Sequence, residues 1–398
     1  MANNNAKPQF SGEWVRLGDA FELRMGKTPS RKNMAYWRNG KHDWVSIADL
    51  GTFDKYVGTT KEQISDLAVT KSGIKPAPAN TVLMSFKLSI GKVAITRSPV
   101  FTNEAIMALV DKGKYQIDPT FIYHQCKAKD WTAGSNTAVM GKTLNKKTLS
   151  ETRIYLPGFE RQIQIAAELD YLDEQIALAN AVSERLDSLV KSRFNELFGK
   201  VAENNLHFPV IKLDDVCTSI VRGPFGSALK KEFFVPKGPG TYKVYEQKHA
   251  IQKQADIGIY YIDGDRYESL NRFECHPGDI LMSCSGTMGE LYQLPPNCEP
   301  GVINQALCKF SLSDAIQVEY FLGCMNQIVD QLGAKGSGIK NVSSVKFIKA
   351  IEIPLPPITL QRDFVTFSVQ VDKLRFDVQQ QIDKLELLKN SLMQEYFG

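Results

Sequence analysis

Features that would mark a membrane, secreted or metal-binding protein are absent from this sequence. No apolar run reaches the ~18–20 residues that a membrane-spanning helix needs. The N-terminus, Met-Ala-Asn-Asn-Asn-Ala-Lys, lacks the apolar segment of a signal peptide. The seven cysteines are scattered without a Cys-x-x-Cys pair, and the five histidines show no metal-ligand spacing. We therefore predict a cytoplasmic protein with reduced thiols, no bound metal and no membrane partner.

Motifs for nucleotide binding are missing as well. A phosphate-binding loop ends in Gly-Lys-Ser/Thr and has another glycine five positions before that final glycine. The tripeptide at 26–28 fits the end of this motif, but the earlier position holds Phe21. The tripeptide at 141–143 has Asn136 in the same place. We expect the chain itself to hold no cofactor.

The sequence also lacks the signature of an adenine methyltransferase, the enzyme alternative that we weighed. Such enzymes hold a flipped adenine with an Asn/Asp-Pro-Pro-Tyr/Phe loop. The Pro-Pro pairs of this chain lie in Leu294-Pro295-Pro296-Asn297 and Leu355-Pro356-Pro357-Ile358, and neither fits. We therefore predict a non-catalytic protein with no catalytic residues.

The most prominent positive feature is a repeat at half the chain length. Phe194-Asn195-Glu196-Leu197-Phe198-Gly199 is echoed by the C-terminal Met393-Gln394-Glu395-Tyr396-Phe397-Gly398. Leu-Met-Ser occurs at 83–85 and again at 281–283, and Leu-Pro occurs at 156–157 and at 355–356. The chain is therefore predicted to contain two domains of similar plan.

Each half closes on a long segment with the apolar spacing of a coiled coil. In residues 160–199 the 4-3 positions begin at Ile165 and end at Leu197, and eight of these ten positions are apolar. No Gly or Pro interrupts this helix before Gly199. Shifting the frame by half the chain places Arg375 and Lys389 in the seam of the second segment, and a neighbouring frame is more apolar. That frame is Phe367, Val371, Leu374, Val378, Ile382, Leu385, Leu388 and Leu392. The apolar stripe is therefore predicted to be wide, as in a helix that faces more than one partner.

The seam residues that we expect at the helix–partner contacts are Leu169, Leu172, Ile176, Leu186, Val371, Val378, Ile382 and Leu385. Elsewhere the pattern predicts a strand that leads into a turn at 44–50, strands at 81–86 and 93–96, and a short helix at 121–127. Gly- and Ser-rich stretches at 131–147 and 332–341 are predicted to be loops.

Charge is distributed unevenly between the halves. Residues 1–155 carry 23 Lys and Arg against 13 Asp and Glu, a net charge of +10, whereas residues 201–354 carry 15 against 17, a net charge of −2. A charge of +10 favours a polyanionic partner such as DNA, because phosphate neutralisation supplies most non-specific affinity. A merely soluble basic surface is the alternative.

The cations that we expect to face DNA lie in loops and turns of both halves. In the first half they are Lys27, Arg31, Lys32, Arg38, Lys41, Lys87, Lys92 and Lys142. In the second half they are Arg222, Lys230, Lys231, Lys248 and Lys340, with His249 and Lys253 as further local cations. The alternatives are solvated basic faces, exposed turns and flexible surface loops.

The order of these motifs resembles the DNA-specificity subunit of type I restriction–modification systems over essentially the whole chain. The motifs that carry the resemblance are Gly26-Lys27-Thr28-Pro29-Ser30-Arg31, Tyr36-Trp37, Trp44-Val45-Ser46-Ile47-Ala48-Asp49-Leu50, Ser85-Phe86, Ile90-Gly91-Lys92-Val93-Ala94, Gly223-Pro224-Phe225-Gly226-Ser227-Ala228-Leu229, Glu160-Arg161-Gln162 and Thr359-Leu360-Gln361. Each motif is short, but together they are duplicated in order at half length.

The resemblance implies an α+β fold in which two pseudo-symmetric globular target-recognition domains are joined by two long antiparallel coiled-coil spacer helices. It divides the chain into a first target-recognition domain (1–156), a central spacer helix (157–199), a second target-recognition domain (200–355) and a C-terminal spacer helix (356–398). It also implies recognition of a bipartite DNA site, one half-site per domain.

The partners that the resemblance implies are double-stranded DNA, two modification subunits that methylate adenine N6, and restriction subunits that translocate DNA. S-adenosylmethionine and ATP would then be bound by those partner subunits alone. A coiled-coil scaffold without nucleic acid is a further alternative, but it leaves the charge of the first domain unexplained.

Overall fold

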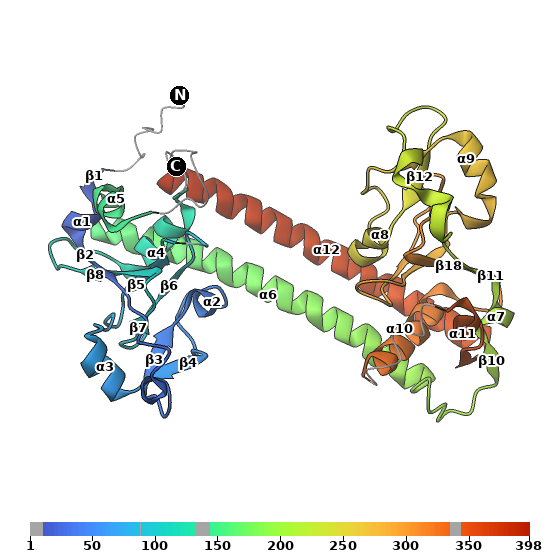
Figure 1. Ribbon diagram of the computed structural model, residues 1–398, viewed down its shortest axis with the longest axis horizontal. Coiled ribbons are helices and arrows are strands. Elements are labelled where there is room, and N and C mark those ends of the chain that lie inside the picture. Colours follow the sequence, from blue (N-terminus) through green and yellow to red (C-terminus); the bar gives the residue numbers. More distant parts are fainter. Residues whose placement is uncertain (1–10, 88, 132–143, 335–343) are drawn as a thin grey trace. The chain divides into compact units, whose positions relative to one another are not determined.

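The computed structural model describes residues 11–87, 89–131, 144–334 and 344–398. The chain forms two compact units, Met1–Ala181 with Gln379–Gly398 and Val182–Val378. Each unit contains one globular domain together with one part of each of two long helices, α6 (Phe159–Phe198) and α12 (Ile358–Phe397). Figure 1 labels the elements of both units.

The first unit contains β1 (Gly12–Arg16), α1 (Leu17–Ala20), β2 (Phe21–Met25), η1 (Met34–Tyr36), β3 (His42–Val45), α2 (Ile47–Leu50), β4 (Glu62–Ile64), α3 (Asp66–Ser72), β5 (Val82–Ser85), β6 (Val93–Ile95), β7 (Phe101–Thr102), β8 (Ile106–Asp111), α4 (Pro119–Ala128), α5 (Lys146–Glu151) and β9 (Arg153–Pro157). An antiparallel sheet has the order β2-β8-β5-β6, and a smaller sheet has the order β4-β3-β7 with β3 and β7 parallel. Strands β1 and β9 pair on their own. The small sheet and α3 form a separate lobe of this domain (Figure 1).

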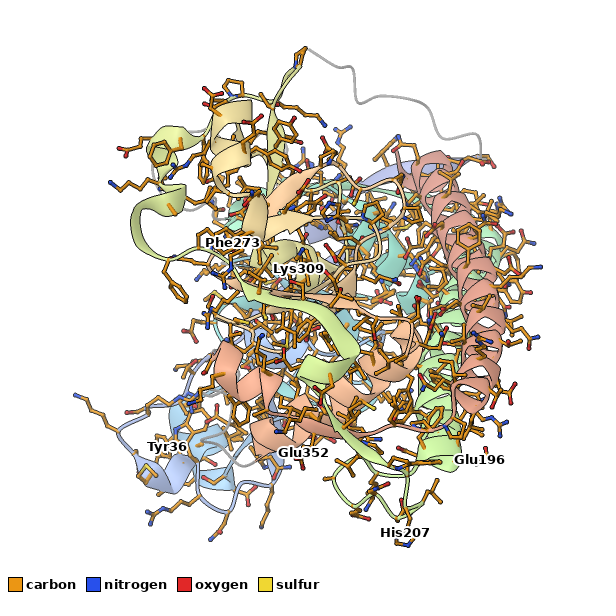
Figure 2. All side chains as sticks on the ribbon, turned by 90° about the vertical axis from the view of Figure 1, so that its right-hand side faces the viewer. Tyr36, Glu196, His207, Phe273, Lys309 and Glu352 are labelled. Carbon is orange, nitrogen blue, oxygen red and sulfur yellow. The ribbon has the colours of Figure 1, made fainter. Side chains whose placement is uncertain are left out.

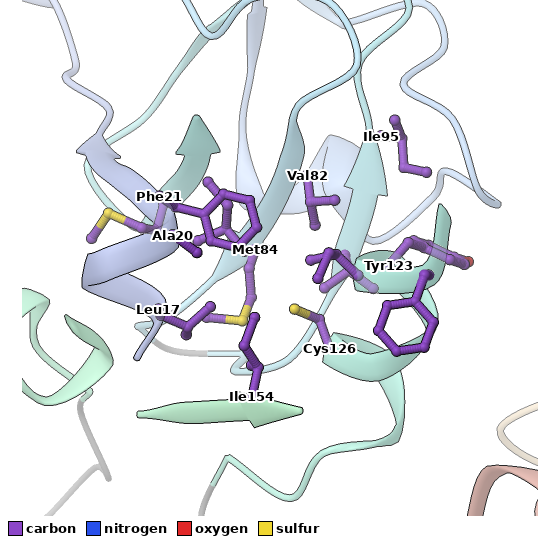
Figure 3. Packing of buried hydrophobic residues seen from close by; sticks show 14 of the residues in the cluster. Leu17, Ala20, Phe21, Val82, Met84, Ile95, Tyr123, Cys126 and Ile154 are labelled. Carbon is purple, nitrogen blue, oxygen red and sulfur yellow. The ribbon is translucent and has the colours of Figure 1, made fainter. Parts of the chain in front are cut away.

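The four-stranded sheet of the first unit is buried on both faces. Along β5, Val82 and Met84 belong to one apolar cluster and Leu83 to another, as the alternation of side chains along a strand requires. Helix α4 covers the first face, where its Tyr123 and Cys126 pack near the strand residues (Figure 3). Burying one large side chain of this kind contributes about 1.5–3 kcal/mol.

The second unit repeats this plan. Its elements are β10 (Val210–Lys212), α7 (Leu213–Val216), β11 (Cys217–Arg222), η2 (Gly226–Leu229), η3 (Lys231–Phe233), β12 (Tyr242–Tyr245), α8 (Gln247–Gln252), β13 (Tyr261–Ile262), α9 (Gly264–Ser269), η4 (Asn271–Phe273), β14 (Glu274–Cys275), β15 (Ile280–Ser283), β16 (Leu291–Gln293), β17 (Gly301–Ile303), β18 (Leu307–Leu312), α10 (Val318–Ala334), α11 (Val345–Lys349) and β19 (Glu352–Pro354). The antiparallel sheet β11-β18-β15-β16 corresponds to β2-β8-β5-β6. The sheet β13-β12-β17-β14 again contains one parallel pair, β12 with β17.

Two buried lysines distinguish the core of the second unit. Lys309 lies beside the segment of Phe273 (Figure 2), donates to the backbone carbonyl of Glu274 and forms an ion pair of 3.3 Å with Asp279. Lys243 is fully buried and forms an ion pair of 3.0 Å with Glu299. Both ammonium groups are therefore paired, as buried charges must be.

A buried glutamine ties each domain to the first turn of the helix that follows it. The Gln162 side chain accepts a hydrogen bond from the Asp118 N–H at 3.0 Å and donates to the Pro157 carbonyl at 2.9 Å. In the second unit, Gln361 accepts from the Gln317 N–H at 2.8 Å and donates to the Pro356 carbonyl at 2.9 Å. The repeat therefore extends to individual hydrogen bonds.

The two long helices confirm the predicted coiled-coil spacing, but they correct the frame of the second helix. In α6, every 4-3 position from Ile165 to Leu197 is buried or half-buried. In α12 the seam instead follows the half-length shift: Arg375 is half-buried and Lys389 lies within the seam, whereas Leu374 and Leu388 are exposed. The more apolar frame was therefore wrong.

Ion pairs explain why cations occupy the seam. In the first unit Lys389 pairs with Asp173, and the Tyr396 hydroxyl donates to Glu168 at 2.6 Å. From Glu168 to Asp173 the residue number rises along α6, while the number of the partner residue on α12 falls from 396 to 389. The two helices therefore run antiparallel within this unit. In the second unit Arg375 pairs with Asp187 at 2.6 Å. The aliphatic stems are buried while the charged ends reach carboxylates at the edge of the seam.

Several local predictions can be checked against the structure. The strands at 82–85 and 93–95 and the helix at 119–128 are confirmed. Of the strand and turn predicted at 44–50, the strand ends at Val45, and residues 47–50 form the short helix α2 because Ser46 and Asp49 make a capping box. Helix α6 ends as predicted at Gly199, which has a φ of +70°.

Both Gly-rich loops fall largely outside the described residues, and so do Lys142 and Lys340. Helix α10 continues to Ala334, past the start predicted for the second of these loops at 332. The seven cysteines are all free thiols, as predicted.

Candidate nucleic-acid interface

Three loops of the first unit meet at one end of its four-stranded sheet, where β2 and β5 end and β8 begins. They are loop A (residues 26–33), loop B (residues 86–92, of which 88 is not described) and loop C (residues 103–105). The Gly26 N–H donates to the Ile106 carbonyl at 3.1 Å, and the Phe86 N–H donates to the Ala105 carbonyl at 3.1 Å. Strands β2 and β5 lie on either side of β8, and both run antiparallel to it. The start of β8 therefore lies beside the ends of β2 and β5.

Glycine is required where loop A passes loop C. A Cβ atom on Gly26 would collide with the carbonyl oxygen of Asn103. The Asn103 side chain accepts a hydrogen bond from the Ala105 N–H at 3.1 Å, which holds loop C in a tight turn. Loop A is therefore held close to the sheet by its backbone, whereas Lys32 near its end is exposed.

Loop B is held by a buried serine. Ser85 donates its hydroxyl to the Ser89 carbonyl at 2.5 Å and accepts a hydrogen bond from the Lys92 N–H at 2.9 Å. The turn reverses at Gly91, whose φ is +87°. Ser85 thus shapes the turn and is not available to DNA.

The second unit builds the same frame from loop A′ (223–225), loop B′ (284–290) and loop C′ (304–306). The Gly223 N–H donates to the Leu307 carbonyl at 3.0 Å, and a Cβ atom on Gly223 would collide with the Asn304 carbonyl. Ser283 donates to the Thr287 carbonyl at 2.6 Å and accepts from the Glu290 N–H at 2.9 Å. Three converging loops therefore recur with the same hydrogen bonds in each unit.

A carboxylate lies at the centre of the loops of the first unit. Thr28 donates a hydrogen bond to Glu104, which lowers the pKa of that carboxyl, although partial burial raises it. The positive charges of Lys87 and Arg31 lower the pKa of Glu104 further. The structure thus brings residues of loops A, B and C together around one group.

Arg31 is held by neighbours within its own domain. Its guanidinium carbon lies 3.7 Å from the Trp37 ring centroid, and its two terminal nitrogens bind the carboxylate of Glu62. This hydrogen-bonded ion pair raises the pKa of Arg31, although slight burial lowers it. Arg31 therefore organises loop A as well as contributing charge to it.

Other predicted cations of the first unit differ in how far they are engaged. Lys27 donates to the Ser72 carbonyl, Lys41 pairs with Asp66 at 3.3 Å, and the Lys92 ammonium lies against Gly51. Lys32 and Arg38 are exposed, and neither side chain has a partner among the described residues. These two remain the freest candidates for phosphate contact in this unit.

In the second unit the predicted cations sit beside aromatic rings or carboxylates. Arg222 donates to the Gln305 carbonyl at 3.2 Å, and its guanidinium carbon lies 5.1 Å from the Phe225 ring centroid. Lys230 pairs with Glu232 at 3.5 Å and Lys248 with Glu246 at 2.7 Å, while Lys231 is exposed.

Two further cations expected in the second unit are engaged inside it. Lys253 donates to Glu290 at 2.9 Å. The prediction for His249 was wrong: the ring is fully buried, and its Nε2 lies 2.7 Å from the Ile257 carbonyl. Burial lowers the pKa of His249, so this ring does not carry charge to the surface.

The eight predicted seam residues lie on the long helices as expected from their spacing. Leu169, Leu172, Val371 and Ile382 are buried, and the other four, Ile176, Leu186, Val378 and Leu385, are half-buried.

Sequence reasoning missed the middle residue of loops C and C′, which is Glu104 in the first unit and Gln305 in the second. The available signal was the repeated Asn-x-Ala at 103–105 and 304–306, in which only this residue changes. It also missed Phe225 as an individual residue, although the preceding Gly223-Pro224 marks a constrained turn.

Neither a metal centre nor a membrane span is found in the part of the chain that the structure describes. No group of three His, Cys, Asp or Glu side chains there is arranged to hold a metal ion. No described helix is both long enough and apolar enough to cross a membrane.

Curated relatives carry a consistent description. The MjaIX type I restriction enzyme specificity subunit of Methanocaldococcus jannaschii is 28% identical over 187 residues, 46% of this chain and 43% of that protein. The EcoprrI specificity subunit of Escherichia coli is 30% identical over 128 residues, 31% of each chain. These matches span less than half of each relative. A putative MjaX specificity subunit of M. jannaschii is 23% identical over 317 residues, 76% of this chain and 73% of that protein.

Solved structures share the fold. The S subunit of a type I restriction–modification system from M. genitalium covers 100% of this chain, with 98% of its own length matched, a TM-score of 0.54 and 15% identity. A chain from a structure on complex assembly and conformational transition of the type I R-M system covers 98%, with 98% of its own length matched, a TM-score of 0.62 and 16% identity. The family profile described as the type I restriction modification DNA specificity domain matches residues 12–188 and 206–387, one match in each half. This chain therefore belongs to the type I restriction modification DNA specificity domain family.

Proposed function

We propose that this chain is the non-catalytic specificity subunit of a type I restriction–modification complex. In this proposal each unit binds one half of a split DNA sequence, and the chain brings two adenine-N6 methyltransferase subunits and the restriction subunits to that site. S-adenosylmethionine and ATP are bound only by those partners. The proposal follows from the family, and it is carried in this chain by the repeated three-loop frame.

The repeated frame supports recognition of two half-sites. Loops A to C and A′ to C′ share their backbone hydrogen bonds, so they present side chains in the same way. Their side chains differ: Glu104 occupies the place of Gln305, and Lys87 the place of Ser285. A common frame with different side chains suits two half-sites of different sequence, because base edges are read by individual side chains.

Cations around the first frame supply phosphate contacts in this proposal. Lys32 is exposed in loop A, Arg38 is exposed shortly after it, and Lys87 lies in loop B. Lys27, Lys41 and Lys92 add charge around them, even though each has a neighbour within the domain. Phosphate contacts fix register and affinity, and they depend strongly on salt.

The long helices offer surfaces for the methyltransferase subunits outside their own seam. In the first unit Tyr171 and Leu178 of α6 and Leu387 of α12 are exposed. In the second unit Leu189 of α6 and Phe376 of α12 are exposed. Exposed apolar side chains on helices that already have a packed seam favour a further partner.

The proposal is tested by expressing the full chain with its methyltransferase partner and mapping the methylated adenines in the host genome. We expect methylation of a single split sequence, with one adenine in each half-site. Methylation that is random or absent while the complex assembles would contradict sequence recognition. A complex that neither binds nor methylates DNA would instead favour the scaffold alternative.

Charge reversal at Lys32 tests the DNA-facing surface with a matched control. Lys32→Glu is expected to weaken binding to the split site and to reduce the slope of log affinity against log salt by about 1. Lys114→Glu reverses an exposed cation in the turn after β8, at the other end of the same sheet, and is expected to leave the slope unchanged. Equal effects of both variants would contradict the placement of the interface at loops A to C.

A further inference from the structure

The equivalent loops of the two units carry contrasting chemistry. Loop A follows its glycine with Lys27 and Thr28, and loop A′ follows its glycine with Pro224 and Phe225. At three positions of these loops a charged residue of the first unit is replaced in the second unit by a neutral one, and Lys92 of loop B is replaced by the acidic Glu290 of loop B′. The three pairs with a neutral residue are Lys27 with Pro224, Lys87 with Ser285 and Glu104 with Gln305. Loops A′ to C′ of the second unit therefore carry less positive charge than loops A to C of the first unit.

Phe225 stands out within loop A′. Its side chain is 66% exposed, and the phenyl ring is held outside the domain core. Gly223 is fixed against loop C′, and Pro224 is buried, so the backbone just before the ring has little freedom. Covering this exposed ring with a partner would remove its apolar surface from water, which is favourable.

A cation accompanies the ring. The guanidinium carbon of Arg222 lies 5.1 Å from the Phe225 ring centroid, and its Nε donates to the carbonyl of Gln305 in loop C′. A ring flanked by a fixed arginine fits nucleic acid, where bases and phosphates lie close together. Apolar wedges of this kind insert between base steps, and stacking of a base on an aromatic ring tolerates any base.

The neighbouring side chains are suited to reading bases without charge. Gln305 is exposed in loop C′, and Ser285 of loop B′ lies 3.4 Å from Gln247 at the start of α8. Amide and hydroxyl groups form hydrogen bonds with base edges. Phe225 thus lies among groups that favour DNA over an apolar protein surface.

We infer that the second unit engages its half-site by stacking the Phe225 ring against DNA bases, whereas the first unit relies on cations at the equivalent loops. This inference rests on the proposed function. Phe225 contributes affinity that does not depend on salt, and it unstacks a base step in the half-site that the second unit reads.

The test compares three variants of the full chain in complex with its methyltransferase partner. Phe225→Ala removes the ring, Phe225→Trp keeps an aromatic surface, and Ile259→Ala truncates another exposed apolar residue of the same unit, 77% exposed. Phe225→Ala is expected to weaken binding to the split site by about 10-fold. Phe225→Trp is expected to bind within about threefold of the parent, and Ile259→Ala to match it.

Two further readouts separate stacking from a charge or folding effect. The salt slope of Phe225→Ala is expected to equal that of the parent, unlike the slope of Lys32→Glu. With 2-aminopurine at positions of the second half-site other than the methylated adenine, the parent complex is expected to raise fluorescence and Phe225→Ala to leave it unchanged. The thermal unfolding midpoints of the parent and of the three variants check that each protein is folded.

Several outcomes would overturn this inference. Parent affinity of Phe225→Ala, an equal loss in Ile259→Ala, or a fluorescence rise that persists without the ring would each do so. Loss of methyltransferase assembly with unchanged DNA binding would mean that Phe225 contacts a protein. If the parent complex itself binds no split sequence, the proposed function fails, and that result is distinct from a parent that binds while Phe225→Ala binds equally well.

Discussion

At the scale of single residues, one buried charge in the second unit is held by a carboxylate that is partly exposed. Lys243 is fully buried, and its ammonium lies 3.0 Å from Glu299, which also accepts hydrogen bonds from Lys237 and from the Tyr261 hydroxyl. Partial burial raises the pKa of Glu299, but these three donors outweigh it and hold the pKa at about 2. Glu299 therefore stabilises the folded state in its charged form.

Replacing this carboxylate is expected to destabilise the protein in a pH-dependent way. Glu299→Gln leaves the Lys243 charge buried without its counter-ion, at an expected cost of about 2 kcal/mol, because the Glu299 side chain is 33% exposed. The unfolded pKa is near 4.3. Since the folded pKa is lower, the stabilisation is complete above about pH 4.3 and is lost as pH falls toward 2. Urea unfolding between pH 7 and pH 3 measures both effects.

The control for this prediction is Glu232→Gln, which removes a mostly exposed carboxylate 3.5 Å from Lys230. It is expected to change stability by less than about 0.5 kcal/mol at any of these pH values. A Glu299→Gln protein as stable as the parent at pH 7, or a difference that grows in acid, would contradict the account of Lys243.

Residue roles were the least predictable part of the candidate site. The sequence shows that Arg31 is a cation in a loop, but not that Glu62 and Trp37 hold it. It shows His249 beside Lys248, but not that the ring is buried. Such partners lie on other strands and helices, so only tertiary structure decides whether a cation is free. Lys32 and Arg38, by contrast, are exposed as their polar loop predicted.

At the scale of the helices, a physical conflict explains why one predicted frame was wrong. A count of apolar residues favoured the frame with Leu374 and Leu388 in the seam, but both side chains are exposed. The actual seam accepts Arg375 and Lys389 because Asp187 and Asp173 neutralise them. The half-length repeat was the better guide, since α6 and α12 have the same length and the same seam positions.

Two truncations in α12 test this frame within the first unit. Ile382→Ala removes a buried seam side chain and is expected to cost about 2–3 kcal/mol of unfolding free energy. Leu388→Ala removes an apolar side chain of the same size outside the seam and is expected to cost less than about 0.5 kcal/mol. Alanine is the best helix former, so neither change lowers helix propensity and any loss of stability reports packing. Chemical denaturation followed by circular dichroism provides the measurement.

The reverse order, with Leu388→Ala more damaging than Ile382→Ala, would restore the more apolar frame. A large effect of Leu388→Ala on assembly with the methyltransferase, without a loss of stability, would instead agree with partner docking outside the seam.

Element-level predictions succeeded where one local signal dominated. The helix over 160–199 follows from an unbroken 4-3 pattern and a terminal glycine, and strands β5 and β6 follow from their β-branched and apolar residues. The short helix at 47–50 was not predicted, because the capping box of Ser46 and Asp49 is a short signal within a stretch that indicates a strand leading into a turn. Gln162 and Gln361 were part of the sequence motifs, but the motifs did not predict that their side chains are buried and hydrogen-bonded.

At the scale of the whole molecule, two halves follow one plan and differ in their loops. Equivalent residues of the two long helices are 199 positions apart in the sequence. In the domains the separation varies: Ser85 and Ser283 are 198 positions apart, and Asn103 and Asn304 are 201 positions apart. Insertions and deletions therefore lie in the domains. This separation made the two-domain plan readable from the sequence, but it gave no measure of the distance between the recognised half-sites.

We propose that the two long helices set this distance, and the proposal makes a geometric prediction. Three heptads, roughly 21 residues, inserted before Ser183 in α6 and before Ile382 in α12 preserve the seam. Each helix becomes about 31 Å longer. At about 3.4 Å per base pair this corresponds to about nine base pairs, close to one turn of DNA. We expect methylation mapping to find both half-sites unchanged and the gap about nine base pairs longer.

A matched control inserts the same three heptads into α6 alone, which leaves the antiparallel partner too short and is expected to abolish methylation. An unchanged gap in the double insertion would contradict a spacing role for the helices. Altered half-site sequences would contradict the division between helices that space and loops that read, because the insertion leaves loops A to C and A′ to C′ untouched. A longer gap with the same half-sites would require both roles, since no residue of either recognition frame has changed.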